Sequence, residues 1–199
     1  AMLWVGWFGF NGGSALAADG AAGMAITVTH IAAATATLTW MTIEWMSHGK
    51  PTLVGAATGA IAGLATITPA SGYVGPVGAL IIGVLAGLIC YKMCGIIKNK
   101  WKIDDALDVM AVHGVGGVLG ILLTAPLGAV AFGGLGLSDQ TIGNQFITQL
   151  IGVIAVGIWC LVITWLITLV VRKFIGLRVT DDEEIEGLDT SVHGEKGYN

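Results

Sequence analysis

The residue best suited to acid–base chemistry in this sequence is His113, which lies in a long apolar stretch rich in glycine. It occurs in the run VMAVHGVGG at residues 109–117, and the sequence stays apolar to Leu123. An ionisable side chain at membrane depth is costly and usually faces the interior of a helix bundle or a pathway. Imidazole also takes up and releases protons near neutral pH. The first hypothesis is therefore transport of a proton or a small polar species; the alternative is a histidine bonded to a neighbouring carbonyl.

A second candidate for chemistry is the run WFGFNGGS at residues 7–14. Aromatic rings next to the hydroxyl of Ser14 could stabilise a cation in a vestibule. Trp4 and Trp7 could equally belong to a belt of aromatic residues at the membrane–water interface. The spacing alone favours neither interpretation.

Other polar residues near these runs are better explained by structure. His30 has small neighbours and no nearby acid, so we expect it to be a hydrogen-bonded packing residue, whereas His48 and His193 lie in polar stretches. Three aspartates, Asp104, Asp105 and Asp108, precede His113 at the expected start of its helix, where carboxylates cap exposed amides and complement the helix dipole. Asp108 is five residues from His113, which makes it a poor direct partner.

Composition shows which elements must position these residues. The chain has 199 residues, of which 55% are hydrophobic and 11% charged, and its mean hydropathy is +0.82. Soluble domains carry about 25% charged residues, so we expect an all-α integral membrane protein. Six apolar segments can each supply most of the roughly 20 residues that a spanning helix needs: 1–18, 22–46, 52–69, 75–97, 104–130 and 146–174. Since Ala1 already opens an apparent helix, we expect a fragment or a processed chain.

The basic residues predict how the segments are oriented. All nine lie at alternate ends of the segments: Lys50, Lys92, Lys98, Lys100, Lys102, Arg172, Lys173, Arg178 and Lys196. Basic residues accumulate on the cytoplasmic side of membrane proteins. We therefore expect residues 1–174 to be the transmembrane region, and residues 175–199 to be a cytoplasmic, acidic and solvated tail. Glycine pairs four residues apart, such as Gly116 and Gly120, predict tight packing between helices.

Several classes of function are disfavoured. The sequence contains no phosphate-binding loop, no nucleotide-binding glycine fingerprint, no HExxH and no GxSxG motif. Its basic residues are too few and too scattered for nucleic-acid binding. Cys90 and Cys94 share a helical face without further ligands close by, so we expect small buried apolar residues and not a metal site. We expect neither an enzyme nor a cofactor.

Taken together, the motifs resemble those of the ammonium transporter family (Amt/Mep/Rh), on the prokaryotic Amt side. The matching runs extend in order over essentially the whole chain: WFGFNGGS at 7–14, GAIAGL at 59–64, TPASGY at 68–73, DDALDVMAVHGVGG at 104–117, GLRV at 176–179, EGLD at 186–189 and HGE at 193–195. The resemblance implies helices six to eleven of an eleven-helix fold. These are the second of two inverted five-helix repeats, the last helix and the cytoplasmic tail, and inverted repeats are a recurring plan among transporters.

The resemblance also implies residue roles. Phe10 would be one of two stacked phenylalanines that gate the outer vestibule, and Ser14 the hydroxyl that binds ammonium at the outer recruitment site. His113 would be the second member of a twin-histidine pair in the pore, and Asp105 the anchor of that helix. Ammonium would lose a proton outside, and ammonia would pass an apolar pore that rejects hydrated ions while imidazoles offer hydrogen bonds.

The implied partners are ammonium or ammonia, the lipid bilayer, two further copies in a homotrimer, and a P-II regulatory protein at the tail. The expected location is the cell (inner) membrane, as a multi-pass protein. An alternative from another class is an ammonium sensor or regulatory membrane subunit that signals through a P-II protein. A truncated product without transport activity is a third.

Overall fold

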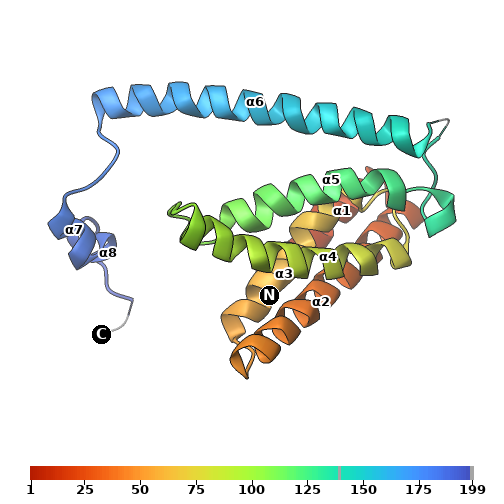
Figure 1. Ribbon diagram of the computed structural model, residues 1–199, viewed down its shortest axis with the longest axis horizontal. Coiled ribbons are helices and arrows are strands. Elements are labelled where there is room, and N and C mark those ends of the chain that lie inside the picture. Colours follow the sequence, from red (N-terminus) through yellow and green to blue (C-terminus); the bar gives the residue numbers. More distant parts are fainter. Residues whose placement is uncertain (139, 198–199) are drawn as a thin grey trace. The chain divides into compact units, whose positions relative to one another are not determined.

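The computed structural model describes residues 1–138 and 140–197, and every regular element in these ranges is a helix. The main helices are labelled in Figure 1: α1 (Met2–Gly13), α2 (Gly20–His48), α3 (Leu53–Ile67), α4 (Pro76–Gly95), α5 (Gly116–Leu127), α6 (Ile142–Phe174), α7 (Asp181–Glu186) and α8 (Leu188–Ser191). Short 3₁₀ turns follow α3 and α5, at Thr68–Ala70 and Val130–Phe132. Two π-helical segments, Ile96–Lys100 and Met110–Val115, follow α4 and precede α5. The contacts divide the chain into two units, 1–153 and 154–199.

Five helical stretches are long and apolar enough to cross a membrane: Gly20–His48, Leu53–Ala70, Pro76–Lys100, Met110–Leu127 and Ile142–Phe174. They correspond to five of the six expected segments. The sixth, residues 1–18, contains α1, and its expected end at residue 18 was wrong because α1 ends at Gly13.

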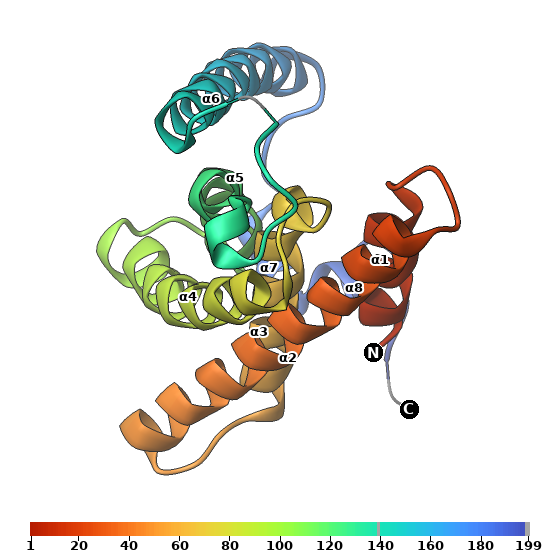
Figure 2. The same cartoon turned by 90° about the vertical axis from the view of Figure 1, so that its right-hand side faces the viewer.

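Helix α2 is the central element of the first unit and packs against α1, α3 and α4 (Figure 2). Its two ends are capped in the usual way. The carboxylate of Asp19 accepts from the backbone N–H groups of Ala21 and Ala22 at 2.9 and 3.2 Å, and Gly49 ends the helix in the left-handed region with φ 78°. Small side chains let the three neighbouring helices approach it closely.

The glycine pairs on α3, α4 and α5 confirm the tight packing that their spacing predicts. A Cβ added at Gly63 would lie 2.5 Å from the carbonyl oxygen of Ala32, and one at Gly83 would lie 2.7 Å from the same atom. A Cβ on Gly120 would overlap the carbonyl oxygen of Thr66. Gly9 and Gly13 are the exception in this set, because a Cβ there meets no atom within 4 Å.

The helix that carries His113 starts later than residue 104, where we expected it. Asp108 has φ +56°, a backbone conformation that breaks a right-handed helix, and helical structure begins at Met110. Just before this point the carboxylate of Asp105 accepts two backbone hydrogen bonds, from Val109 and Met110, both at 2.8 Å. The capping aspartate therefore marks the start of the helix and lies outside it.

A buried carboxylate that the sequence analysis passed over joins α2 to α3. Glu44 is 9% exposed. Its carboxylate accepts from the backbone N–H of Thr52 at 2.7 Å and from the Thr52 hydroxyl at 3.1 Å. The Thr52 hydroxyl in turn accepts from the N–H of Gly55 at 2.9 Å and caps α3. This chain of hydrogen bonds satisfies the buried carboxylate.

The second unit contains the later part of α6 and the two short helices α7 and α8. Thr180 and Glu183 form a reciprocal capping box at the start of α7. Hydrogen bonds from the backbone N–H of Thr180, and then from its hydroxyl, hold the pKa of Glu183 below its ordinary value. Arg178 forms an ion pair with Glu184 at 2.6 Å. The division between membrane region and tail at residue 174 stays a prediction; helix α6 ends there, at Phe174.

Candidate functional site

His113 and Trp7 form the centre of the candidate site. The rings lie nearly parallel, with an interplanar angle of 13° and 6.3 Å between centroids. His113 belongs to the π-helical segment before α5, whereas Trp7 lies in the middle of α1. Single π turns inside helices often occur at functional sites because they re-aim a side chain without ending the helix. Here the side chain in question carries the imidazole.

Trp7 is held in place by a hydrogen bond across 61 residues of sequence. Its indole Nε1–H donates to the Thr68 hydroxyl at 2.7 Å, and that hydroxyl donates to the carbonyl of Leu64 at 2.7 Å. Thr68 opens the 3₁₀ turn after α3. The Thr68 hydroxyl thus accepts one hydrogen bond and donates another, and both fix its position. The indole ring on which His113 stacks therefore has a defined orientation.

Phe10 extends this aromatic cluster on the same helix as Trp7. The two rings meet edge to face at 80°, with centroids 6.2 Å apart. The side chain of Phe10 is 61% exposed, and His113 is also exposed in this chain. An apolar hollow of about 280 Å³ lies beside Phe10 and is lined by Met2, Leu3, Gly6, Trp7 and Phe10. The arrangement is an open apolar face with one titratable ring next to it.

Ser14 is placed at the end of α1, four residues beyond Phe10. Its hydroxyl donates to the Phe10 carbonyl at 2.7 Å, so its lone pairs remain to accept a hydrogen bond. Ser14 lines a second, more polar hollow of about 280 Å³, together with Asn11, Thr68, Ser71 and Tyr73 among others. Thr68 thus both bonds Trp7 and lines this polar cavity. A hydroxyl oxygen that can only accept suits a donor such as an N–H cation.

Asp105 lies at the start of the segment that carries His113. Its two carboxylate oxygens cap the first turn through Val109 and Met110. Nearby, Asp108 forms an ion pair at 2.8 Å with Lys98, which lies in the π-helical segment after α4. Both contacts are consistent with a positioning role, and the role of Asp105 as a helix anchor stays a prediction.

Two other histidines of the first unit, His30 and His48, have contacts of their own. The His30 ring packs against Trp4 and Phe8, with centroid distances of 5.4 and 5.9 Å. His48 Nε2 is 3.2 Å from the Tyr91 hydroxyl. In residues 1–138 and 140–197, no three His, Cys, Asp or Glu side chains are grouped so that they could hold a metal ion. Cys90 is buried, Cys94 is half-buried, and both are free thiols.

Two site residues were missed by reasoning from the sequence. Thr68 lies within the run TPASGY, but no local pattern indicates that its hydroxyl meets a tryptophan on another helix. Asn11 is 3% exposed and donates to the Thr29 hydroxyl at 2.9 Å, joining α1 to α2. An asparagine inside an apolar helix is a signal that could have been followed, because such residues bond across helices in membranes.

Comparison with known proteins places this geometry in a family. The sequence profile described as the Ammonium Transporter Family matches residues 1–198. The chain is 46% identical to the ammonium transporter of Aquifex aeolicus over 200 residues, which are 100% of this chain and 47% of that protein. It is 40% identical to the ammonium transporter of Bacillus subtilis, again over 100% of this chain and 50% of the other. The chain therefore spans about half the length of these relatives.

Solved structures agree with the sequence comparison. A structure named Sensor Amt Protein superposes with a TM-score of 0.83 at 34% identity, covering 98% of this chain and 47% of that one. Mep2 of Candida albicans superposes with a TM-score of 0.80 at 38% identity, covering 91% of this chain and 42% of that one. The expected all-α membrane fold is confirmed by these matches and by the five candidate spans.

Proposed function

Because the chain belongs to the ammonium transporter family, we propose that it forms part of a transporter that moves ammonium or ammonia across the cell membrane. The observation that carries the proposal is the stacking of His113 on Trp7, beside the exposed ring of Phe10. An apolar face excludes hydrated ions, while a neutral imidazole can both donate to and accept from ammonia. In this proposal His113 contacts the passing molecule or its proton.

Phe10 and Ser14 would act before His113, at the outer end. The negative faces of aromatic rings attract a cation. The free lone pairs of the Ser14 hydroxyl would accept an N–H bond from ammonium, since its own proton is given to the Phe10 carbonyl. Together they would concentrate the cation at the entrance. No resident cofactor is needed for this chemistry, and the proposed activity is transport and not catalysis.

Orientation and partners are part of the proposal. Lys50 follows α2, four lysines surround the end of α4, and Arg172 with Lys173 ends α6. The positive-inside rule then puts the α7–α8 segment in the cytoplasm. There it would meet a P-II protein, and three copies of the transporter would associate in the membrane. Light scattering of the complete protein in detergent tests the trimer, and labelling of single cysteines from either side of the membrane tests the orientation.

The test of function is the His113→Ala variant of the complete transporter in proteoliposomes. We expect the ammonium-dependent current to disappear, or selectivity against potassium to be lost. His30→Ala is a matched control, since it removes the other histidine at membrane depth, which packs on Trp4 and Phe8 away from the site. Unchanged current and unchanged selectivity in His113→Ala would refute the proposed role.

A second function is supported by one finding, the likeness to a protein named as a sensor. An ammonium sensor would bind ammonium at the same site and signal through the tail. Measuring P-II binding and ammonium-dependent current distinguishes the two functions. A sensor would bind a P-II protein through residues 175–199 and give no ammonium-dependent current, whereas a transporter gives the current whether or not P-II is present.

A further inference from the structure

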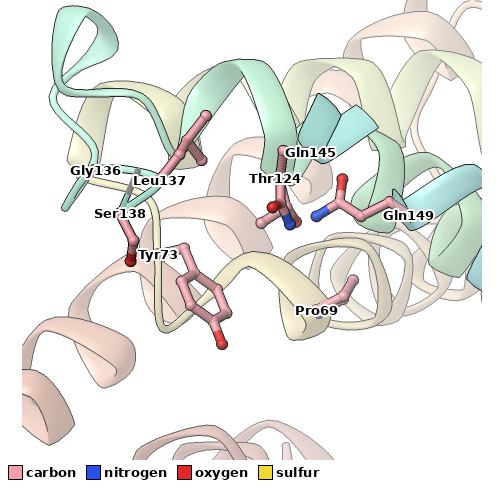
Figure 3. A pocket seen from close by; sticks show the side chains of 8 residues that line it. All are labelled: Pro69, Tyr73, Thr124, Gly136, Leu137, Ser138, Gln145 and Gln149. Carbon is pink, nitrogen blue, oxygen red and sulfur yellow. The ribbon is translucent and has the colours of Figure 1, made fainter. Parts of the chain in front are cut away.

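Two glutamines on α6 lie on the same face of the helix, one turn apart. Gln145 and Gln149 are half-buried, whereas the three residues between them are exposed. Within the first unit, this face of α6 is turned toward α5 and the 3₁₀ turn after α3, as the side chains in Figure 3 show. Amide side chains at such a position need hydrogen-bond partners, because the surrounding helices are apolar.

The glutamines line a cavity of about 240 Å³, which we term the α5–α6 pocket (Figure 3). Its other lining residues come from three separate segments and are Pro69, Tyr73, Thr124, Gly136, Leu137 and Ser138. None of these is Trp7, Phe10, Ser14 or His113, although Pro69 and Tyr73 also line the polar cavity beside Ser14. A single water molecule needs roughly 10–15 Å³, so the cavity has room for a guest of several heavy atoms.

Two oxygen atoms in the pocket can only accept. The Gln149 Oε1 atom is buried and has no hydrogen-bond partner among the residues that the structure describes. The Thr124 hydroxyl already donates to the carbonyl of Gly120 at 2.8 Å, so only its lone pairs are left. A buried carbonyl oxygen without a donor is unfavourable and rare in native proteins. The guest must therefore bring its own O–H or N–H donors.

The lining also indicates the charge of the guest. None of the eight lining residues that the structure describes is Asp, Glu, Lys or Arg. A charged guest would lose hydration without meeting an opposite charge, which is costly. The amide N–H groups of the glutamines can, in contrast, donate to neutral hydroxyls, and the hydroxyls of Tyr73 and Ser138 can both donate to them and accept from them.

We propose that the α5–α6 pocket binds a small uncharged polyol group, whose hydroxyls donate to Gln149 Oε1 and Thr124 Oγ1. The group can come from a free polyol in the medium or from the glycerol head group of a lipid, since the chemistry is the same. The proposal does not depend on the transport function, because its two acceptors, Gln149 and Thr124, line the α5–α6 pocket and not the cavity beside Ser14.

Saturation-transfer NMR with glycerol as the probe tests this. The complete protein is measured in a detergent without hydroxyl groups, so that glycerol is the only polyol present. We expect saturation to pass from the protein to the glycerol protons, and to fall at least fivefold in Gln149→Leu and in Thr124→Val. Thr148→Val is the matched control, because Thr148 is exposed on the same turn of α6, and it keeps the full signal.

The outcome is decided by these variants together. No transfer to glycerol in the parent protein, or equal transfer in Gln149→Leu and Thr124→Val, overturns the proposal. Should one variant fail to fold by circular dichroism, the other still decides. In nanodiscs, loss of the glycerol signal with phosphatidylglycerol but not with phosphatidylcholine supports binding of the lipid head group. An equal signal in both lipids supports binding of the free polyol.

Discussion

The rings of Trp7 and His113 lie nearly parallel, at 13° and with 6.3 Å between centroids, although 106 positions separate them in sequence. The contact depends on two supports. Thr68 holds the indole through a 2.7 Å hydrogen bond, and the cap at Asp105 sets the start of the segment that carries the imidazole. Both supports can be removed singly, and each gives a different expected result.

Removing the Thr68 hydroxyl should weaken the positioning of Trp7 while its ring stays in the site. Thr68→Val keeps the side-chain shape but leaves the Trp7 indole N–H without its acceptor. Leaving a donor of this partly buried pair without its acceptor costs about 1–3 kcal/mol when it is shielded from water. Since 1.4 kcal/mol corresponds to a factor of ten, we expect transport to fall by about fivefold. Thr68→Ser, which keeps the hydroxyl, should transport at the parent rate. Equal currents in parent and Thr68→Val would show that the indole orientation has no effect on transport.

Removing the cap at Asp105 should weaken the start of the His113 segment. In Asp105→Ala the N–H groups of Val109 and Met110 lose their acceptors, and loss of a helix cap costs about 1 kcal/mol, within a range of roughly 0.5–2. Unfolding of the detergent-solubilised protein by dodecyl sulfate measures the loss. Asp104→Ala, at the exposed neighbouring position, is the control and should unfold as the parent does.

Two glycines three residues apart should respond in opposite ways to the same change. A Cβ on Gly120 overlaps the carbonyl oxygen of Thr66, so Gly120→Ala must push α5 off α3. We expect a loss of about 1–3 kcal/mol, as for other overpacked interiors. A Cβ on Gly117 meets no atom within 4 Å, so Gly117→Ala should leave the protein equally or slightly more stable. Thermal unfolding of both variants compares them directly.

The capping box of α7 makes a pH-dependent contribution to the stability of that helix. Bonds from Thr180 lower the pKa of the Glu183 carboxyl, so the bonds favour the ionised form. A group whose pKa is lowered by folding stabilises the folded state above its unfolded pKa, and that contribution is lost as pH falls through the folded pKa. We therefore expect the first turn of α7 to be complete at neutral pH and to fray in acid.

Carboxyl NMR of the labelled protein measures the effect on Glu183. In Thr180→Ala its pKa should move up toward the ordinary value for glutamate. Ser191→Ala, which removes a hydroxyl in α8 that donates to the Gly187 carbonyl at 3.0 Å, should leave the Glu183 titration unchanged. An identical titration in the parent protein and Thr180→Ala would contradict the capping-box explanation.

Much of the fold follows from hydropathy. The expected segments 22–46, 52–69 and 75–97 differ from the observed candidate spans by no more than three residues at either end. Long apolar runs bounded by polar residues can only satisfy their backbone as helices in a membrane, so local composition is sufficient there. It was not sufficient at residues 1–18 and 104–109, where the helix ends depend on single residues such as Asp108, with φ +56°.

The sequence by itself therefore determined the class of the protein and its apolar helices, because residue type and local spacing carry that information. His113 stood out for the same reason, whereas the roles expected of Phe10, Ser14 and Asp105 came from the resemblance to the family. Their roles remain to be tested. Only the tertiary structure decided that Trp7 stacks on His113 and is held by Thr68, that Glu44 bonds Thr52, and that Gln149 faces a pocket. These contacts join distant helices, and the packing that creates them depends on how whole helix surfaces fit together and not on any local pattern.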